Sequence, residues 1–315
     1  MSNIQQTGDK VLANVERVIV GKHLEVRLAL VALLCRGHLL IEDVPGTGKT
    51  VLAKAIARSL GGSFRRIQFT PDLLPTDVTG VNVFNQERGD FEFKPGAIFA
   101  NIVLGDEINR ASPKTQSALL ECMEERQVTV DTETHPLGTP FMVIATQNPI
   151  EHEGTYPLPE AQLDRFMLRL SIGYPTNDVE AEILASHSAG TPLGEIGPVT
   201  DAPGVADMIE QARQVHVAAA IRRYIVDIVE ATRRHSDMYL GASPRASIMI
   251  LRATRALAAA EERDYVIPDD VKALAVPSLA HRIIVTADAV MTGRSPEVVL
   301  KEILAEVPVP VAETP

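Results

Sequence analysis

The stretch Gly46-Thr47-Gly48-Lys49-Thr50 decides the fold of this chain. It follows closely on an apolar run, His38–Ile41, that is typical of a strand. It opens a segment in which Leu52, Ile56 and Leu60 recur at helical spacing. Backbone N–H groups of such a glycine-rich turn converge on phosphate oxygens, and the positive end of the following helix dipole adds to the attraction. This order of strand, turn and helix predicts a nucleotide-phosphate site in an α/β domain.

Individual residues of this phosphate-binding loop (residues 43–50) have distinct expected roles. Lys49 is placed to reach the β- and γ-phosphates, and the Thr50 hydroxyl is a ligand for Mg²⁺. Asp43 departs from the common pattern, because a glycine usually stands five residues before Gly48. We expect ATP or ADP, with Mg²⁺, as the ligands. The expected nucleotide-binding set is Gly46, Thr47, Gly48, Lys49, Thr50 and Val51.

A second apolar run, Ile102–Leu104, is followed after Gly105 by the adjacent carboxylates Asp106 and Glu107. Asp106 is expected to hold Mg²⁺ through its hydration shell, and Glu107 to polarise the attacking water as general base. Two surface acids at the end of a strand are the alternative interpretation. The phosphate-binding loop lies upstream at a distance typical of a parallel sheet, and this favours the hydrolytic interpretation.

The first half of the chain alternates apolar runs with helical patterns, which predicts an α/β domain with a parallel five-stranded sheet over residues 1–173. A hairpin around the polar turn Asn85–Asp90 is predicted to form an insert at about residues 78–95. The expected strands are His38–Ile41, Phe64–Phe69, Ile102–Leu104, Phe141–Thr146 and Phe166–Ile172.

The character of the chain changes after Gly173, where residues 174–200 are predicted to form a hinge or linker and a first helix. Residues 201–315 carry apolar side chains at three- and four-residue spacing, which predicts a small all-α domain. The expected helices are Val205–Ala220, Ile221–His235, Ser247–Arg263 and Asp269–His281.

The composition of the chain narrows the range of functions that we expect of it. The chain has 315 residues and a net charge of −11, which argues against a general nucleic-acid binder. Aromatic residues make up only 4%, which leaves few platforms for base stacking. The N-terminal segment lacks the apolar core of a signal peptide, and the longest apolar run is too short to span a bilayer. We expect a cytoplasmic protein without a membrane span.

The two motifs together resemble those of the AAA+ ATPase superfamily, and further segments resemble its MoxR family, in the helix-2-insert clade. The likeness covers nearly the whole chain. It implies a P-loop AAA+ core with a small all-α lid domain, and the family tolerates Asp43 in the loop. The segments that carry it are Glu42–Thr50 (EDVPGTGKT), Gly105–Ala111 (GDEINRA), Ala145–Pro149 (ATQNP) and Leu158–Phe166 (LPEAQLDRF).

The resemblance implies roles for three further side chains. Asn148 matches sensor 1, which helps to place the lytic water; a turn-forming residue before proline is the alternative. Arg165 matches the arginine finger, which acts on nucleotide bound by the neighbouring subunit; a surface ion-pair partner is the alternative. Arg245 matches sensor 2, although a plain helix-end charge remains open. Other arginines that compete for the sensor 2 role are Arg222, Arg223 and Arg252.

Two more features have counterparts in the family. Val20 and Gly21 stand where the family holds the adenine, although Lys22 after them is often glutamine there. The predicted hairpin resembles the helix-2 insert, which projects from the ring and engages targets in relatives; a surface hairpin without function is the alternative. Arg110 follows the carboxylate pair and has no assigned role.

The resemblance implies an oligomeric, Mg²⁺-dependent ATPase, a homo-oligomeric ring that is habitually hexameric in the family. It also implies chaperone-like remodelling or activation of partner proteins, among them proteins with a von Willebrand factor A domain. The alternatives are a nucleic-acid translocase or helicase-type motor, a magnesium-chelatase-like motor subunit and a nucleotide-gated scaffold without hydrolysis. Stimulation of hydrolysis by DNA would favour the translocase, whereas the presence of both Asp106 and Glu107 argues against the scaffold.

Overall fold

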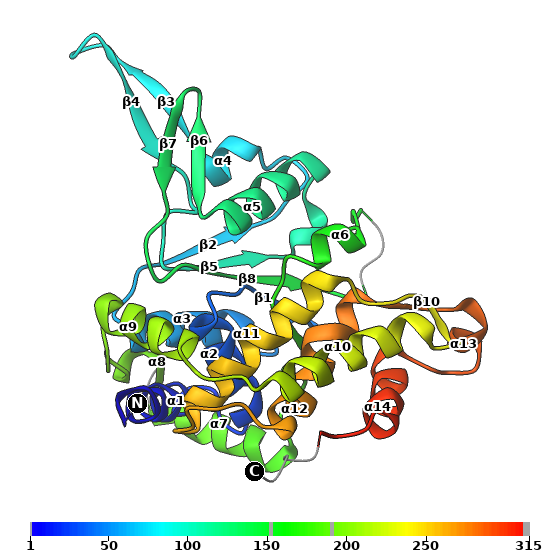
Figure 1. Ribbon diagram of the computed structural model, residues 1–315. Helices are drawn as coiled ribbons and strands as arrows, with labels where there is room; N and C mark the ends of the chain where they lie inside the picture. Colours follow the sequence, from blue (N-terminus) through cyan, green and yellow to red (C-terminus); the bar gives the residue numbers. More distant parts are fainter. Residues whose placement is uncertain (1, 151–153, 190–191, 311–315) are drawn as a thin grey trace.

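A central parallel sheet organises the computed structural model, which describes residues 2–150, 154–189 and 192–310 (Figure 1). Its five strands lie in the order β2-β5-β8-β1-β9, and every neighbouring pair is parallel. The predicted five-stranded α/β fold is therefore confirmed. Only the last strand is much shorter than its predicted range. The strands are β1 (Leu39–Glu42), β2 (Phe64–Gln68), β5 (Ile102–Asp106), β8 (Met142–Gln147) and β9 (Leu168–Leu170).

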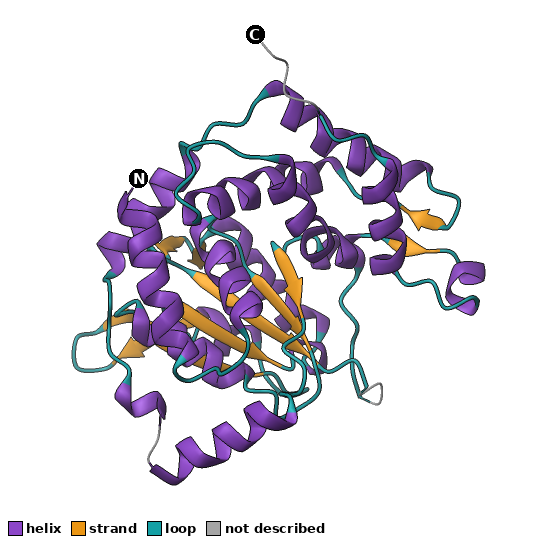
Figure 2. Ribbon diagram, turned by 90° about the horizontal axis from the view of Figure 1, so that it is seen from below, coloured by secondary structure: helices purple, strands orange, loops and turns teal. Residues whose placement is uncertain are grey.

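The sheet is covered by helices on both faces, as Figure 2 shows. Successive side chains of β1 point to opposite faces, so Leu39 and Ile41 join one apolar cluster and Leu40 joins another. The first cluster includes side chains from α1 (Ser2–Glu16), α2 (His23–Leu34) and α3 (Lys49–Ser59), and the second includes side chains from α5 (Pro113–Glu125). Burial on both faces is the reason that β1, β5 and β8 are nearly continuous apolar runs.

Two hairpins project together from one end of the sheet (Figure 1). The first pairs β3 (Gly80–Asn85) with β4 (Asp90–Pro95), around the turn that the sequence predicts, and it follows the short helix α4 (Pro75–Thr79). The second, β6 (Gln127–Val130) with β7 (Glu133–Pro136), has no counterpart among the predicted elements. The Phe93 and His135 rings stack between the two hairpins, with centroids 3.9 Å apart. The hairpins therefore support each other.

The rest of the chain is mainly helical, and we call residues 201–310 the helical region. One short antiparallel pair, β10 (Met238–Leu240) with β11 (Ile284–Val285), lies among its helices. Short helices elsewhere are η1 (Ile108–Arg110), α6 (Glu160–Leu163) and α8 (Pro192–Glu195). The longer helix α7 (Asn177–Ala189) precedes the helical region, whose own helices are α9 (Ala202–Arg213), α10 (Ala219–Arg234), α11 (Pro244–Ala260), α12 (Pro268–Leu279), η2 (Ala280–Arg282), α13 (Ala287–Met291) and α14 (Pro296–Glu306).

One predicted helix is wrong at its C-terminal end. The pattern from Val205 predicts a helix to Ala220, but α9 ends at Arg213. The backbone of His216 instead accepts from the N–H of Val266 at 3.0 Å and donates to the carbonyl of Asp264 at 2.8 Å. These hydrogen bonds to a segment about fifty residues away replace helical ones, so tertiary contacts decide this boundary. Among the described residues, none of the helices has both the length and the apolar content needed to traverse a lipid bilayer.

Two buried histidines make the stability of this fold depend on pH. Burial, aided by the positive charge of Arg126, lowers the pKa of His38 from 6.5 to about 3. Burial likewise lowers the pKa of His281 well below 6.5. Below pH 6.5 the unfolded chain binds protons that the folded chain refuses, so each histidine is expected to lower the free energy of unfolding by about 1.4 kcal/mol per pH unit. Urea unfolding at several values between pH 7.5 and 5 measures this slope.

The variant His38→Gln provides the control for this prediction. His38 Nδ1 accepts from the N–H of Val143 and Nε2 lies 2.9 Å from the carbonyl oxygen of Met123. A glutamine amide offers the same donor and acceptor but no titration in this range. Because the variant lacks one titrating group, its free energy of unfolding should fall less steeply with decreasing pH, by about 1.4 kcal/mol per pH unit. An unchanged slope would contradict the lowered pKa of His38.

Candidate functional site

The phosphate-binding loop lies between the end of β1 and the start of α3, at the edge where the parallel strands end. Gly46 and Gly48 adopt φ angles of +88° and +90°. Only glycine adopts this left-handed conformation without strain, so both positions require it. The Lys49 ammonium donates to the carbonyl oxygens of Asp43 at 3.1 Å and Val44 at 2.6 Å. These contacts hold its charge beside the loop.

The structure gives a reason for Asp43 at the position where the common pattern has glycine. Its side chain is buried, and Oδ2 accepts from the N–H groups of Ile172 at 2.8 Å and Gly173 at 2.6 Å. Its other oxygen accepts from the N–H of Val44 at 2.9 Å. Asp43 therefore connects the phosphate-binding loop to the segment that leads from β9 toward α7. A glycine could make none of these side-chain contacts.

Asp106 ends β5 and its carboxylate is fixed on both sides. Oδ1 accepts from the Thr146 hydroxyl at 2.6 Å, and Oδ2 accepts from the Arg66 guanidinium at 2.6 and 3.1 Å. Thr146 is on β8 and Arg66 is on β2, the strands that flank β5. The sequence analysis does not single out either residue, although Thr146 ends a predicted strand, which is an available signal, and Arg66 lies in the middle of another.

Glu107 follows with a left-handed φ of +57°, which turns the chain sharply after the strand. Its N–H donates to Thr146 Oγ1 at 2.9 Å. Its Oε2 accepts from Gln68 Nε2 at 2.9 Å and from Arg110 at 3.1 Å. Glu107 is thus held by side chains from the end of β2 and from η1. Gln68, like Arg66, was not singled out in the sequence.

A cavity of about 400 Å³ brings most of the predicted residues together. Asn148 lies at its wall and is buried, with Oδ1 accepting from the N–H of Ile150 at 3.1 Å. That contact is the turn-type bond of the alternative interpretation, so Asn148 both caps a turn and faces the cleft. The predicted residues on the walls of this cavity are Gly46, Gly48, Lys49, Thr50, Val51, Asp106, Glu107 and Asn148.

A second cavity of about 630 Å³ adjoins the first, because Gly46, Gly48 and Val51 line both. Thr47 and Val20 line it as well, with apolar side chains such as Ile19 and Ile172. Its apolar walls suit the flat face of a nucleobase. Gly21 is not among the residues on its walls. It adopts φ +73°, and a Cβ there would come within 3.0 Å of Val179.

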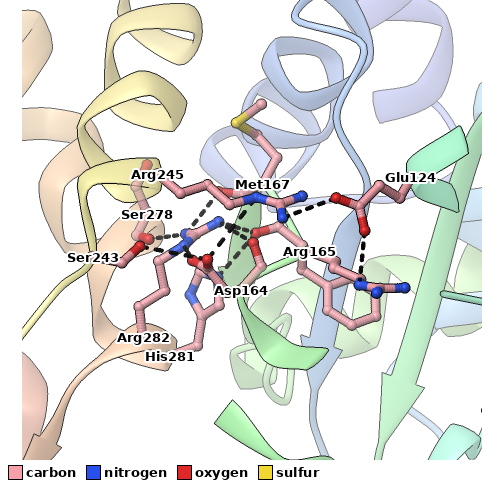
Figure 3. Close-up of polar contacts among 10 residues, drawn as sticks. Glu124, Asp164, Arg165, Met167, Ser243, Arg245, Ser278, His281 and Arg282 are labelled. Carbon is pink, nitrogen blue, oxygen red and sulfur yellow. Dashed lines mark hydrogen bonds and ion pairs between the residues drawn. The ribbon is translucent and has the colours of Figure 1, made fainter. Parts of the chain in front are cut away.

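Arg165 and Arg245 lie on neither cavity wall. Both instead contact Glu124 on α5: Arg165 Nε lies 3.1 Å from one carboxylate oxygen, and Arg245 donates to the other at 3.0 Å (Figure 3). Arg245 Nε also lies 3.9 Å from Asp164. The structure therefore brings these two arginines to each other, and it does not bring them to the cleft of their own chain.

Arg282 of the helical region holds the segment that carries Arg165. Its side chain is only 1% exposed, and Nε donates to Asp164 Oδ1 at 2.7 Å (Figure 3). The same guanidinium donates to the backbone oxygens of Phe166 and Met167, and His281 Nε2 lies 3.1 Å from the Phe166 oxygen. Removing one partner of a buried, hydrogen-bonded ion pair strongly destabilises a fold, because the other charge is then left uncompensated. Arg282 therefore fixes Asp164 and its neighbour Arg165 to the helical region.

Comparison with known proteins places this architecture in a family. Residues 38–168 match the profile described as "ATPase family associated with various cellular activities (AAA)", and residues 230–303 match an "AAA lid domain". A crystal structure of an ATPase candidate from Cytophaga hutchinsonii superposes with a TM-score of 0.91 at 38% identity, covering 98% of this chain and 96% of that one.

Relatives found by sequence similarity support the same family. An uncharacterised Bacillus subtilis protein, YeaC, is 50% identical over 96% of this chain and 94% of its own length. "Chaperone MoxR1" of Mycobacterium tuberculosis is 44% identical over 96% of this chain and 82% of its own, and "Protein MoxR" of Paracoccus denitrificans is 34% identical over 84% and 85%. With these relatives, and with a phosphate-binding loop and an acidic strand end facing one cleft, the chain belongs to the MoxR family of AAA+ ATPases.

Proposed function

We propose that this ATPase is Mg²⁺-dependent and works as a homo-oligomer, a six-membered ring in keeping with its family, in which each nucleotide is held by two neighbouring subunits. The observation that carries the proposal is the separation of its charged groups. Lys49, Asp106 and Glu107 share one cleft, whereas Arg165 and Arg245 lie together elsewhere on Glu124. Two guanidiniums placed outside their own cleft are suited to serve the cleft of a neighbouring copy.

The cleft contains suitable ligands for nucleotide and metal. The loop N–H groups and Lys49 hold the phosphates, and the Thr50 hydroxyl and the Asp106 carboxylate, both on its wall, are oxygen ligands of the kind that Mg²⁺ prefers. When bound, the ion neutralises charge on the phosphates. The adjoining apolar cavity receives the adenine, with Val20 on its wall. Gly21 does not line this cavity, and we assign it the role of allowing the left-handed turn that follows Val20.

Hydrolysis needs a base and an oriented water. Glu107 serves as base, because its carboxylate lies on the cleft wall and is oriented by Gln68 and Arg110. Asn148, on the same wall at the end of β8, orients the water. Arg165 and Arg245 of the next subunit stabilise the negative charge on the transferred phosphoryl group. Within a single chain both contact Glu124 and lie on neither cavity wall.

We propose that ATP hydrolysis drives chaperone-like remodelling of partner proteins, including those with a von Willebrand factor A domain. Two relatives that cover most of the chain are named for chaperone or MoxR proteins. In this proposal residues 1–173 form the nucleotide-binding domain, 174–200 the hinge and 201–315 the lid. The β3–β4 hairpin offers a contact surface, since Phe84 and Phe91 are exposed near its tip and their rings pack edge to face, with centroids 5.4 Å apart.

Dilution tests the shared site. If Arg165 acts on a neighbour, ATP turnover per subunit falls once the enzyme is diluted below its assembly range, because isolated chains lack the finger. Turnover is measured over a wide range of enzyme concentration, with the oligomeric state followed by light scattering at each point. Turnover that stays constant while the assembly dissociates would contradict a finger supplied by the neighbour.

A further inference from the structure

We propose that a second anion site lies between α2, α5, α9 and α11 and takes a small molecule with two or more phosphate groups. A cavity of about 420 Å³ opens there, which is within the range of small-molecule pockets. Of the residues that the structure describes, five arginines and no carboxylate line it. Its walls are Leu34, Cys35, Arg36, Arg126, Ile209, Ala212, Arg213, Arg252 and Arg255.

This arginine pocket is separate from the nucleotide cleft. It shares no wall residue with either nucleotide cavity. Arg36 precedes β1, whereas the phosphate-binding loop follows that strand. Arg126 donates to the backbone oxygen of Phe141, which directly precedes β8. The pocket therefore lies toward the opposite edge of the parallel sheet, and a ligand there is not a nucleotide in transit to the P-loop.

The positive charge in the pocket is poorly compensated. Elsewhere in the described chain most buried or half-buried arginines face a carboxylate, as Arg282 faces Asp164, whereas the half-buried Arg126 and Arg255 of this pocket do not. In the pocket only Arg213 has such a partner among the described residues, namely Glu210 at 2.9 Å. Clustering of like charges without acids destabilises a fold, and such clusters are characteristic of sites that bind an oppositely charged ligand.

Two of these arginines are partly withdrawn from water. Burial, together with the neighbouring charges of Arg36 and Arg252, lowers the pKa of Arg126 to about 10. The Arg126 guanidinium donates to backbone oxygens of Arg36 and Phe141, which are neutral acceptors. Arg255 Nε is buried and has no hydrogen-bond partner among the described residues. An unpaired buried donor is expensive, and a ligand oxygen would satisfy it.

The chemistry of the walls identifies the ligand class. Guanidinium forks match the oxygen geometry of phosphate, and several forks around one cavity call for a ligand with several adjacent negative charges. Leu34, Ile209 and Ala212 add an apolar wall that fits a nonpolar part of such a molecule. Because α2 and α5 belong to the sheet domain and α9 and α11 to the helical region, the bound ligand would bridge the two.

Tripolyphosphate is the probe for this site. All measurements use the Lys49→Ala background, which removes a phosphate ligand of the nucleotide cleft. Arg252→Ala and Arg36→Asn test the pocket, and asparagine is chosen because Arg36 has φ +55°, which asparagine tolerates. The matched control is Arg88→Ala, an exposed arginine in the turn of the β3–β4 hairpin that lines none of the three cavities. Calorimetry gives the affinity, and thermal unfolding reports binding to the folded state.

We expect tripolyphosphate to bind and to raise the unfolding temperature in the Lys49→Ala background and in the Arg88→Ala control. Each pocket variant should weaken binding by about tenfold or more, the loss expected for one charge-assisted hydrogen bond. Equal weakening by Arg88→Ala, or unchanged affinity in the pocket variants, would overturn the proposal. Binding of a single-stranded oligonucleotide without binding of tripolyphosphate would overturn it too, in favour of a nucleic-acid surface.

Discussion

Replacing Arg165 by alanine will reduce ATP turnover by about three to five orders of magnitude, as for arginine fingers of other enzymes, and will leave ATP binding intact. The side chain lies outside its own cleft, beside Glu124, so its loss removes no contact to the nucleotide of the same chain. Turnover is measured by phosphate release, and binding by a fluorescent ATP analogue. Arg88→Ala is the matched control, because Arg88 is an exposed arginine in the turn of the β3–β4 hairpin.

Mixed assemblies decide whether the finger acts between subunits. Arg165→Ala subunits keep the base, and Glu107→Gln subunits keep the finger. Each variant alone is inactive, but an equimolar mixture regains on the order of one quarter of wild-type turnover, since a random interface joins an intact cleft to an intact finger in that fraction of cases. A mixture as inactive as its components, in the presence of mixed assemblies shown by cross-linking, would refute an action across the interface.

Glu107→Gln will lower turnover by about two to four orders of magnitude while ATP binding remains. Glutamine keeps the size of the side chain and can still contact Gln68 and Arg110, which hold Glu107 now. It cannot accept a proton from water at neutral pH. Glu121→Gln is the matched control, because Glu121 is an exposed carboxylate on α5, away from the cleft.

The same variant provides a way to find the partner. With hydrolysis blocked, the ATP-bound form persists, so a partner that binds this form is retained on an affinity-tagged Glu107→Gln protein in ATP and released in ADP. Unchanged turnover in Glu107→Gln would remove Glu107 as the base.

The sequence predicts the architecture of the cleft well because its determinants are local. The phosphate-binding loop and the strand that ends at Asp106 are each contained in fewer than ten residues, and parallel pairing brings their ends to one edge of the sheet. The sequence could also have indicated Arg66 and Gln68. Both belong to a predicted strand, yet their contacts to Asp106 and Glu107 depend on β2 lying beside β5.

Other features depend on contacts between distant parts of the chain, which no pattern in a single sequence reveals. Asp43 looks like a defect in the loop motif until Ile172 and Gly173 are seen to donate to it. Arg245 has the helix-start position expected of sensor 2, but its carboxylate partner Glu124 lies 121 residues earlier. The premature end of α9 has the same origin, because a distant segment binds the His216 backbone.

The ion pair between the buried Arg282 and Asp164 has a consequence for the coupling between neighbouring subunits. Arg165 directly follows Asp164, and we assign its guanidinium to the phosphates bound by the neighbouring subunit. Arg282 couples this segment to the helical region of its own chain. In the proposed ring, a movement of one subunit's helical region would shift the Arg165 side chain that we assign to the adjoining subunit.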